Sequence, residues 1–384
     1  MPYLPTDHIE RQFLRDAAGE VASANERTIL RHIWESPGIA RSELVARSNL
    51  TQQSVHRIVE HLGDRGLLSF GPPKPGLGRG QPSPTLKLNG DYAYCWGISV
   101  TTDLIGLSLM DFSGKCLATE DVPFYGQSLG QALDQIRETL AAMTARLALD
   151  TERHFGIGFA IAGYFVDGTR FNASLPLHEW SLIELGPLLN EKFDKPTWVH
   201  NGANTGAIAE AMFGIGRHVH HFAYMSFNYG FGGGLISNGE LLVGGNGNAG
   251  EFSQMFFPEE MKQRPALENL LECLQKAGVE VPSLSYLRQH FSPDWPGAQE
   301  WITAMEPGIN RLINGITAVF DPQAIVFGGQ VPSRLAEALI AHVRHAGEAR
   351  YGVARQVPKL IISKIPGDAS SLGASIVPFK ESFF

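Results

Sequence analysis

The chain has 384 residues, which is longer than one compact core usually serves, so its length predicts two or three domains. Its hydrophobic fraction of 43% and charged fraction of 18% are ordinary for a globular protein. The sequence has no apolar run near the roughly 18 residues that cross a bilayer, no signal-peptide stretch at its N-terminus and no CxxC pair among its three cysteines. These features exclude a membrane protein and a disulfide scaffold, and they favour a cytoplasmic location.

The net charge of −8 is unevenly distributed along the chain. Residues 1–90 carry 11 Lys/Arg and 9 Asp/Glu, a net charge of +2. The whole chain has 31 Lys/Arg and 39 Asp/Glu, so residues 91–384 carry 20 basic and 30 acidic residues, a net charge of −10. Between Arg41 and Lys87 there are 7 basic and 3 acidic residues. A short positive segment in an acidic protein suits a small module that contacts nucleic acid.

The N-terminal segment predicts three short helices. Residues 25–36 place apolar side chains at helical spacing, and a Pro-Gly pair ends that helix. Residues 41–48 form a second helix. Thr51 is expected to cap a third helix by accepting a hydrogen bond from a backbone N–H of its first turn. The third helix has one apolar face, made of Val55, Ile58, Val59 and Leu62.

The opposite face of the third helix is polar near its N-terminal end, and such hydrogen-bonding side chains read base edges in the major groove. Strands at 67–70 and 85–88 then enclose a basic loop rich in Gly and Pro, the pattern of a wing that reaches the minor groove. The residues predicted to contact DNA are Arg41, Thr51, Gln52, Gln53, Ser54, His56, Arg57, Lys74 and Arg79. A small protein-interaction domain is the alternative interpretation.

The rest of the chain alternates short apolar runs with longer helical stretches. Runs at 222–227, 325–327 and 360–362 are bounded by Gly or Pro, and the helical stretches include 129–147 and 306–320. This alternation is typical of α/β lobes.

Several motifs resemble those of the ROK family (repressor, open reading frame, kinase). They are SELVARSNLTQQSVHRIVEHLGDRGLL with GLGRGQP, GIGFAIAGYFVDG, HNGANTGAIAEAMFGIGR, NYGFGGGLISNGEL, GGNGNAGE and DPQAIVFGGQV. The resemblance implies a winged helix-turn-helix DNA-binding domain at 1–89 and an actin-like (ribonuclease H-like) sugar-kinase-type domain. That domain would have a first lobe at 90–200 and a second lobe at 201–384, which the resemblance implies is the dimerisation lobe, with the C-terminal helix returning to the first lobe.

The family's kinase chemistry is not matched in this chain. The kinases take the proton of the attacking hydroxyl with the Asp of an Asn-Asp pair, and the matching pair here is Asn201-Gly202. Ser99 stands where the first phosphate motif has an Asp, and Tyr229 would crowd a nucleotide. The resemblance therefore implies no kinase activity and no cofactor. A sugar kinase fused to a DNA-binding module is the alternative.

Many family members bind zinc through one His and three Cys. The matching positions are Gln254, Glu259, Met261 and Ala266. These residues do not suit zinc as a set, so no metal site is predicted.

The sugar end of the family's site is better matched. The positions that the resemblance assigns to an effector are Ser174, Asn201, Gly202, Glu251, Gln254 and Glu268. Amides and carboxylates suit sugar hydroxyls, because they donate or accept paired hydrogen bonds. Loss of the Asp at 202 and of the His at 254 is expected to shift specificity away from glucose-like ligands. The alternative interpretation is that these residues are relics of a sugar site. Their polar groups would then be hydrogen-bonded within the protein or to water in an empty cleft.

The function expected from these features is a DNA-binding regulator, most simply a repressor of carbohydrate uptake and catabolism genes. A sugar or sugar derivative would bind between the lobes, and a homodimer or tetramer would read two operator half-sites in double-stranded DNA. Control by a partner protein instead of a small ligand is a third interpretation.

Overall fold

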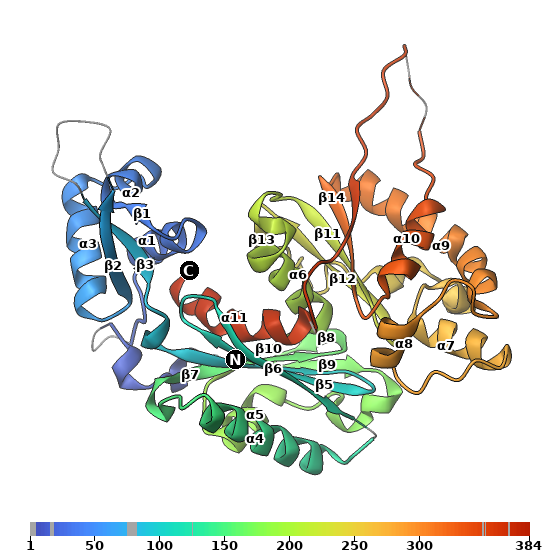
Figure 1. The fold of residues 1–384 in the computed structure, drawn as a ribbon, viewed down its shortest axis with the longest axis horizontal. Coiled ribbons are helices and arrows are strands. Elements are labelled where there is room, and N and C mark those ends of the chain that lie inside the picture. The colour runs from blue at the N-terminus through green and yellow to red at the C-terminus, as the bar shows by residue number, and fades with distance from the viewer. Residues whose placement is uncertain are drawn as a thin grey trace.

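The computed structural model describes residues 5–15, 19–74, 83–124, 126–347, 349, 351–367 and 369–384. Figure 1 shows a small N-terminal unit at one end of the long axis, a first α/β lobe along the middle and a second α/β lobe at the other end. Within the described residues, no helix combines the length and apolar character that a membrane span requires.

The N-terminal unit is a winged helix-turn-helix, with the strand order β1-β3-β2. Its elements are η1 (Pro5–His8), η2 (Arg11–Phe13), α1 (Ala24–Glu35), β1 (Ile39–Ala40), α2 (Arg41–Arg47), α3 (Gln52–Asp64), β2 (Leu68–Lys74) and β3 (Ser83–Leu88). A capping box of Ser23 and Glu26 starts α1, and Thr51 caps α3. The predicted helices and strands of this unit are confirmed. Strands β2 and β3 are both longer than predicted, and the short strand β1 was not predicted.

The first lobe is a five-stranded sheet in the order β10-β7-β4-β5-β6. Its elements are η3 (Gly90–Tyr92), β4 (Tyr94–Val100), β5 (Leu104–Asp111), β6 (Cys116–Pro123), α4 (Leu129–Arg146), η4 (Thr151–Arg153), β7 (His154–Ile161), β8 (Gly163–Asp167), β9 (Arg170–Ala173), η5 (Leu175–Trp180), α5 (Leu185–Phe193) and β10 (Thr197–Asn201). The strands β4, β7 and β10 are parallel. Helices α4 and α5 lie on one face of this sheet (Figure 1).

The second lobe is a five-stranded sheet in the order β13-β12-β11-β14-β15. Its elements are α6 (Gly202–Phe213), η6 (Ile215–Arg217), β11 (Phe222–Phe227), β12 (Phe231–Ser237), β13 (Glu240–Leu241), η7 (Phe252–Met255), η8 (Pro258–Gln263), α7 (Leu267–Lys276), α8 (Leu284–His290), α9 (Ala298–Phe320), β14 (Ala324–Gly329), α10 (Ser333–Ala341) and β15 (Lys359–Ile362). Helix α6 packs on one face, and α7 to α10 share the core on the other face.

Helix α9 begins earlier than the predicted stretch at 306–320. It starts at Ala298 and includes Pro307 in its interior. The apolar face continues upstream of the proline through Trp301, Ile302 and Met305, all of which are buried. Packing of this face therefore outweighs the loss of one helical hydrogen bond at Pro307.

The last helix, α11 (Ala369–Phe383), leaves the second lobe and packs on the sheet of the first lobe. It approaches the strands so closely that a Cβ at Gly97 would collide with the carbonyl oxygen of Ser371, and one at Gly158 with that of Ala374. Its C-terminal Phe379, Phe383 and Phe384 belong to the same apolar cluster as the core of the winged helix. Helix α11 therefore connects the lobes to the N-terminal unit through one continuous core.

Candidate functional site

Helix α3 presents polar side chains on an exposed surface of the winged helix. The apolar face of Val55, Val59 and Leu62 is fully buried, which orients the helix so that its other face meets solvent. The side chains of Gln52, Gln53, His56 and Arg57 are exposed, and Ser54 is partly buried. A polar helix surface of this shape fits the major groove.

Four of the predicted DNA contacts, Arg41, Thr51, Ser54 and His56, already have partners within the winged helix. Thr51 accepts a hydrogen bond from the backbone N–H of Ser54 at 3.2 Å and donates to the Ser54 hydroxyl at 2.9 Å. Arg41 is partly buried and contacts Nδ1 of His56 at 2.5 Å, while Nε2 of His56 lies 3.0 Å from Glu60. Arg41 of α2 therefore contacts α3 through His56, whereas Thr51 caps the first turn of α3.

The wing is described only at its base. Strands β2 and β3 pair up to Lys74 and Ser83, with an irregular register between Gly71 and Pro73. The backbone of Lys74 ends β2, whereas the predicted contact Arg79 lies outside the described residues.

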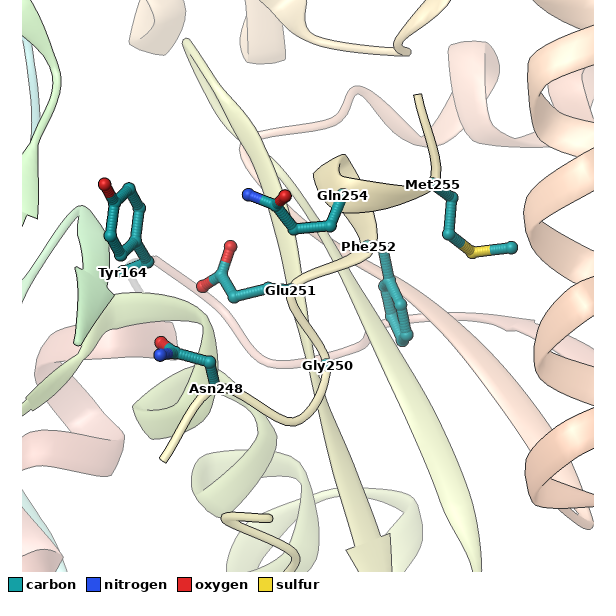
Figure 2. A pocket seen from close by; sticks show the side chains of 7 residues that line it. All are labelled: Tyr164, Asn248, Gly250, Glu251, Phe252, Gln254 and Met255. Atoms are coloured by element: carbon teal, nitrogen blue, oxygen red, sulfur yellow. The ribbon is translucent and has the colours of Figure 1, made fainter. Parts of the chain in front are cut away.

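A cavity of about 280 Å³ lies where the second lobe meets β8 of the first lobe. Its lining residues are Tyr164, Asn248, Gly250, Glu251, Phe252, Gln254 and Met255. Figure 2 shows the polar ends of Tyr164, Asn248, Glu251 and Gln254 gathered on one side, with Phe252 and Met255 directed away from them. The polar side of this cavity suits a ligand with several hydroxyl groups.

Glu251 is the central acceptor of this cavity. Burial raises the pKa of its carboxyl group above the ordinary value. Its Oε1 accepts a hydrogen bond from Nδ2 of Asn201 at 3.2 Å, and the same nitrogen donates to the carbonyl oxygen of Gly163 at 2.6 Å. The Asn201 Oδ1 caps α6 by accepting from the N–H groups of Ala203 and Asn204. Asn201 therefore links both lobes to the cavity carboxylate.

Gly202 is the first residue of α6. The nearest atoms to a Cβ built at this position are the carbonyl oxygen of Ile161 at 3.7 Å and Oγ of Ser370 at 3.9 Å. Both distances are ordinary van der Waals contacts. Packing around the Cβ position therefore does not require glycine here. The absence of the aspartate that the family's kinases have at this position removes a proton acceptor and is not explained by a lack of space for a Cβ.

The remaining predicted effector residues are not all at the cavity. Gln254 lines it, but Ser174, Gly202 and Glu268 are not among the lining residues. Ser174 is exposed at the start of η5. Glu268 hydrogen-bonds to Tyr229 and lies 3.8 Å from the guanidinium of Arg264.

The residues that the sequence prediction missed are Tyr164 and Asn248. The Tyr164 hydroxyl accepts a hydrogen bond from Asn172 at 2.8 Å. Asn248 donates to the carbonyl oxygen of Phe165 and accepts from its N–H, both at 2.8 Å. These contacts hold the glycine-rich segment of the second lobe against β8. The segment was recognisable in the sequence, but its pairing with β8 required the fold.

The region matching the first phosphate motif forms a contact between the lobes. Oδ2 of Asp103 accepts a hydrogen bond from the N–H of Leu284 at 3.1 Å, at the start of α8. Burial raises the pKa of Asp103 in spite of this hydrogen bond. Ser99 is buried in β4. Asp103 therefore helps to hold α8 against the first lobe.

Both lobes also contact α1 of the winged helix. Glu240 of the second lobe pairs with Arg31 of α1 at 3.1 Å and with Lys380 of α11. Trp34 of α1 packs edge-on against Phe213 at the end of α6, with ring centroids 6.1 Å apart, and against Phe384 at 5.1 Å. A change in the angle between the lobes would therefore move groups that touch α1.

The N-terminal unit and the two-lobed domain each match a known protein family. Residues 23–69 match a winged helix-turn-helix DNA-binding family, and residues 95–273 match the ROK family. An uncharacterized protein of Sinorhizobium fredii, y4fQ, is 28% identical over 94% of this chain and 92% of its own length. The xylose repressor of Caldicellulosiruptor bescii is 23% identical over 91% of this chain and 94% of the repressor.

The fold is also that of a solved protein. A ROK family transcriptional regulator, described as a homolog of the E. coli MLC protein, superimposes with a TM-score of 0.71. It shares 19% identity, and the match covers 93% of this chain and 95% of the regulator. The chain therefore joins a winged helix-turn-helix DNA-binding domain to a ROK family domain.

Proposed function

We propose that the chain is a sugar-responsive transcriptional repressor of carbohydrate uptake and catabolism genes, acting as a homodimer or tetramer and without kinase activity. The observation that carries the proposal is the combination of the exposed helix α3 with an interlobe cavity lined by Glu251. The Glu251 carboxylate accepts a hydrogen bond from Asn201, and the neighbouring position 202 is a glycine, which supplies no base. The repressor names of the relatives support the same interpretation.

Binding of the effector would act on DNA through the contacts between the lobes and α1. The cavity residues come from both lobes, so a ligand there favours one interlobe arrangement over another. The pair Arg31–Glu240 and the packing of Trp34 on Phe213 connect that arrangement to the winged helix. The effector would thus shift the population between two placements of the DNA-binding modules.

Footprinting on the DNA upstream of the chain's own gene tests the proposal. Protection is expected over an inverted repeat, and it should weaken when an effective sugar is added. The sugar panel should include D-xylose and a set of hexoses. Absence of protection at moderate salt, with and without these sugars, would contradict DNA binding.

Arg57→Ala is expected to weaken operator binding. Arg57 is exposed on the recognition helix, and loss of one base or phosphate contact typically costs about 1–3 kcal/mol. Electrophoretic mobility shift at two salt concentrations measures the change. Arg137→Ala, which removes an exposed arginine of α4, is the matched control. Equal affinities of both variants for the operator would remove Arg57 from the interface.

The chain is expected to show no sugar-dependent ATP turnover. Glycine at 202 cannot accept the proton of an attacking hydroxyl, and no other residue is assigned that role. A coupled ADP assay with the sugar panel measures turnover. Activity that disappears in Asn201→Ala would establish the kinase alternative. Gly202→Asp, whose Cβ would make only ordinary van der Waals contacts, is the informative companion variant.

A further inference from the structure

A second cavity, of about 450 Å³, lies where the winged helix meets the first lobe, and it is here called the junction cavity. It shares no lining residue with the cavity around Glu251. Small-molecule sites commonly have this size and lie at junctions between folded units. The side chains that give the junction cavity its character are Trp34, Pro37, Lys87 and Leu88 of the winged helix and Asp91 and Asp111 of the first lobe.

The wall on the first lobe is negatively charged. Oδ1 of Asp111 accepts hydrogen bonds from the Ser113 hydroxyl at 2.7 Å and from the N–H of Lys115 at 2.9 Å, which fixes the carboxylate in its turn. Its Oδ2 lies over Gly90, only 2.7 Å from where a Cβ would stand. Asp91, the next residue, is exposed and lines the same wall. Two carboxylates at one wall suit an ammonium group.

The wall on the winged helix combines a positive charge with apolar surface. Lys87 is exposed on β3, and its Cε lies 4.0 Å from a Cβ built at Gly38, so its side chain lies near the turn after α1. Leu88 is buried, and Trp34 is partly buried. Within the part of the chain that the structure describes, Lys87 forms an ion pair with neither carboxylate of the opposite wall. Its ammonium group is therefore available to a ligand.

The opposite charges of the two walls indicate the class of ligand. A carboxylate group would bind Lys87, and an ammonium group would bind Asp91 and Asp111. An apolar body would lie against Trp34 and Leu88. A molecule with a single charge would pair with one wall only. A small zwitterion with an apolar side chain pairs with both walls, and free apolar amino acids have this composition.

We propose that the junction cavity binds an apolar amino acid, which holds the winged helix against the first lobe. The lining residues belong to both units, so the complete set of contacts exists only while the units touch. Binding therefore favours this placement of the winged helix over others. Neither a sugar nor DNA enters the proposal, so failure of the sugar-responsive repression proposed above would leave it standing.

Isothermal titration calorimetry of the full chain with L-leucine and L-phenylalanine tests the ligand class. At least one of the two is expected to bind. The corresponding amines, isopentylamine and phenethylamine, and acids, isocaproate and hydrocinnamate, each lack one charge and should bind at least about tenfold more weakly. Failure of both amino acids to bind at millimolar concentration, or an analogue with one charge that binds equally well, would overturn the proposal.

Two substitutions test the position of the site. Lys87→Gln and Asp91→Asn are each expected to weaken binding of the amino acid at least about tenfold. Both side chains are exposed, so the fold should tolerate the changes. Lys115→Gln, at an exposed lysine outside the cavity, is the matched control and should leave the dissociation constant unchanged. An unchanged constant in either Lys87→Gln or Asp91→Asn would remove that wall from the site and refute the proposal.

Hydrogen exchange measured by mass spectrometry follows the two units separately. The N–H of Gly38 donates to the carbonyl oxygen of Leu86 at 2.8 Å, and that of Gly114 donates to the carbonyl oxygen of Asp111 at 2.9 Å, so each wall has a hydrogen-bonded turn whose opening can be measured. The amino acid should slow exchange in both turns. Slower exchange at one wall alone would show that the ligand does not join the two units.

Discussion

Glu251→Gln is expected to weaken the response to the effector strongly while leaving the folded protein at least as stable as the wild type. The substitution keeps the shape of the side chain and an oxygen that accepts the hydrogen bond from Asn201. It removes the negative charge that strengthens hydrogen bonds donated by the hydroxyl groups of a ligand. Hydrogen bonds to a charged group contribute about 1.5–3 kcal/mol. Sugar affinity should therefore fall roughly 10- to 100-fold.

The expected stability change follows from the raised pKa of Glu251. The folded protein holds the Glu251 proton more tightly than the unfolded chain does, so ionisation of Glu251 destabilises the fold as pH rises through this range. Glutamine cannot ionise. The free energy of unfolding of the variant, relative to that of wild type, should accordingly be highest near neutral pH. This difference should decline as the pH is lowered toward the ordinary pKa of a glutamate.

Operator release by the sugar panel and thermal unfolding between about pH 4 and pH 8 measure both effects. Glu259→Gln is the control, because Glu259 is exposed nearby and does not line the cavity. A variant at 251 with an undiminished sugar response would show that this carboxylate does not contact the effector. If wild type itself responds to no sugar, control by a partner protein gains support.

Phe383→Ala is expected to destabilise the winged helix and the first lobe together. Phe383 is fully buried and its ring lies 4.9 Å from that of Phe112, 5.2 Å from that of Phe155 and 5.9 Å from that of Tyr92. Truncation of a buried phenylalanine typically costs about 3–5 kcal/mol. Because the core is shared, the winged helix and the first lobe should lose this stability together.

Urea unfolding followed by circular dichroism, with operator affinity measured in parallel, checks this prediction. Phe257→Ala removes an exposed phenylalanine and should change stability by less than about 0.5 kcal/mol. A loss of under about 1 kcal/mol in the Phe383 variant would mean that α11 and the winged helix do not depend on one core.

The sequence was most informative where a signal is local. The helices of the winged unit followed from apolar spacing, and the cap at Thr51 from residue type. The start of α9 was missed because Pro307 suggests a boundary, while burial of Trp301 and Met305 extends the helix. Tertiary packing thus overrode a local signal.

The site was predictable only in part, for a different reason. Glu251 could be named because it ends the motif GGNGNAGE, and Gln254 because it matches a family position that is usually His. Tyr164 joins them only because β8 lies against that motif, and no spacing along the chain encodes this contact.

Trp34 lies where the winged helix meets both lobes. Its indole contacts the rings of Phe213 and Phe384, and it occupies the space over Gly114. Trp180, Trp198 and Trp301, by contrast, are buried within the lobes. The fluorescence of Trp34 should therefore change when the DNA-binding unit separates from the lobes, which would provide an intrinsic optical probe of the proposed regulatory motion.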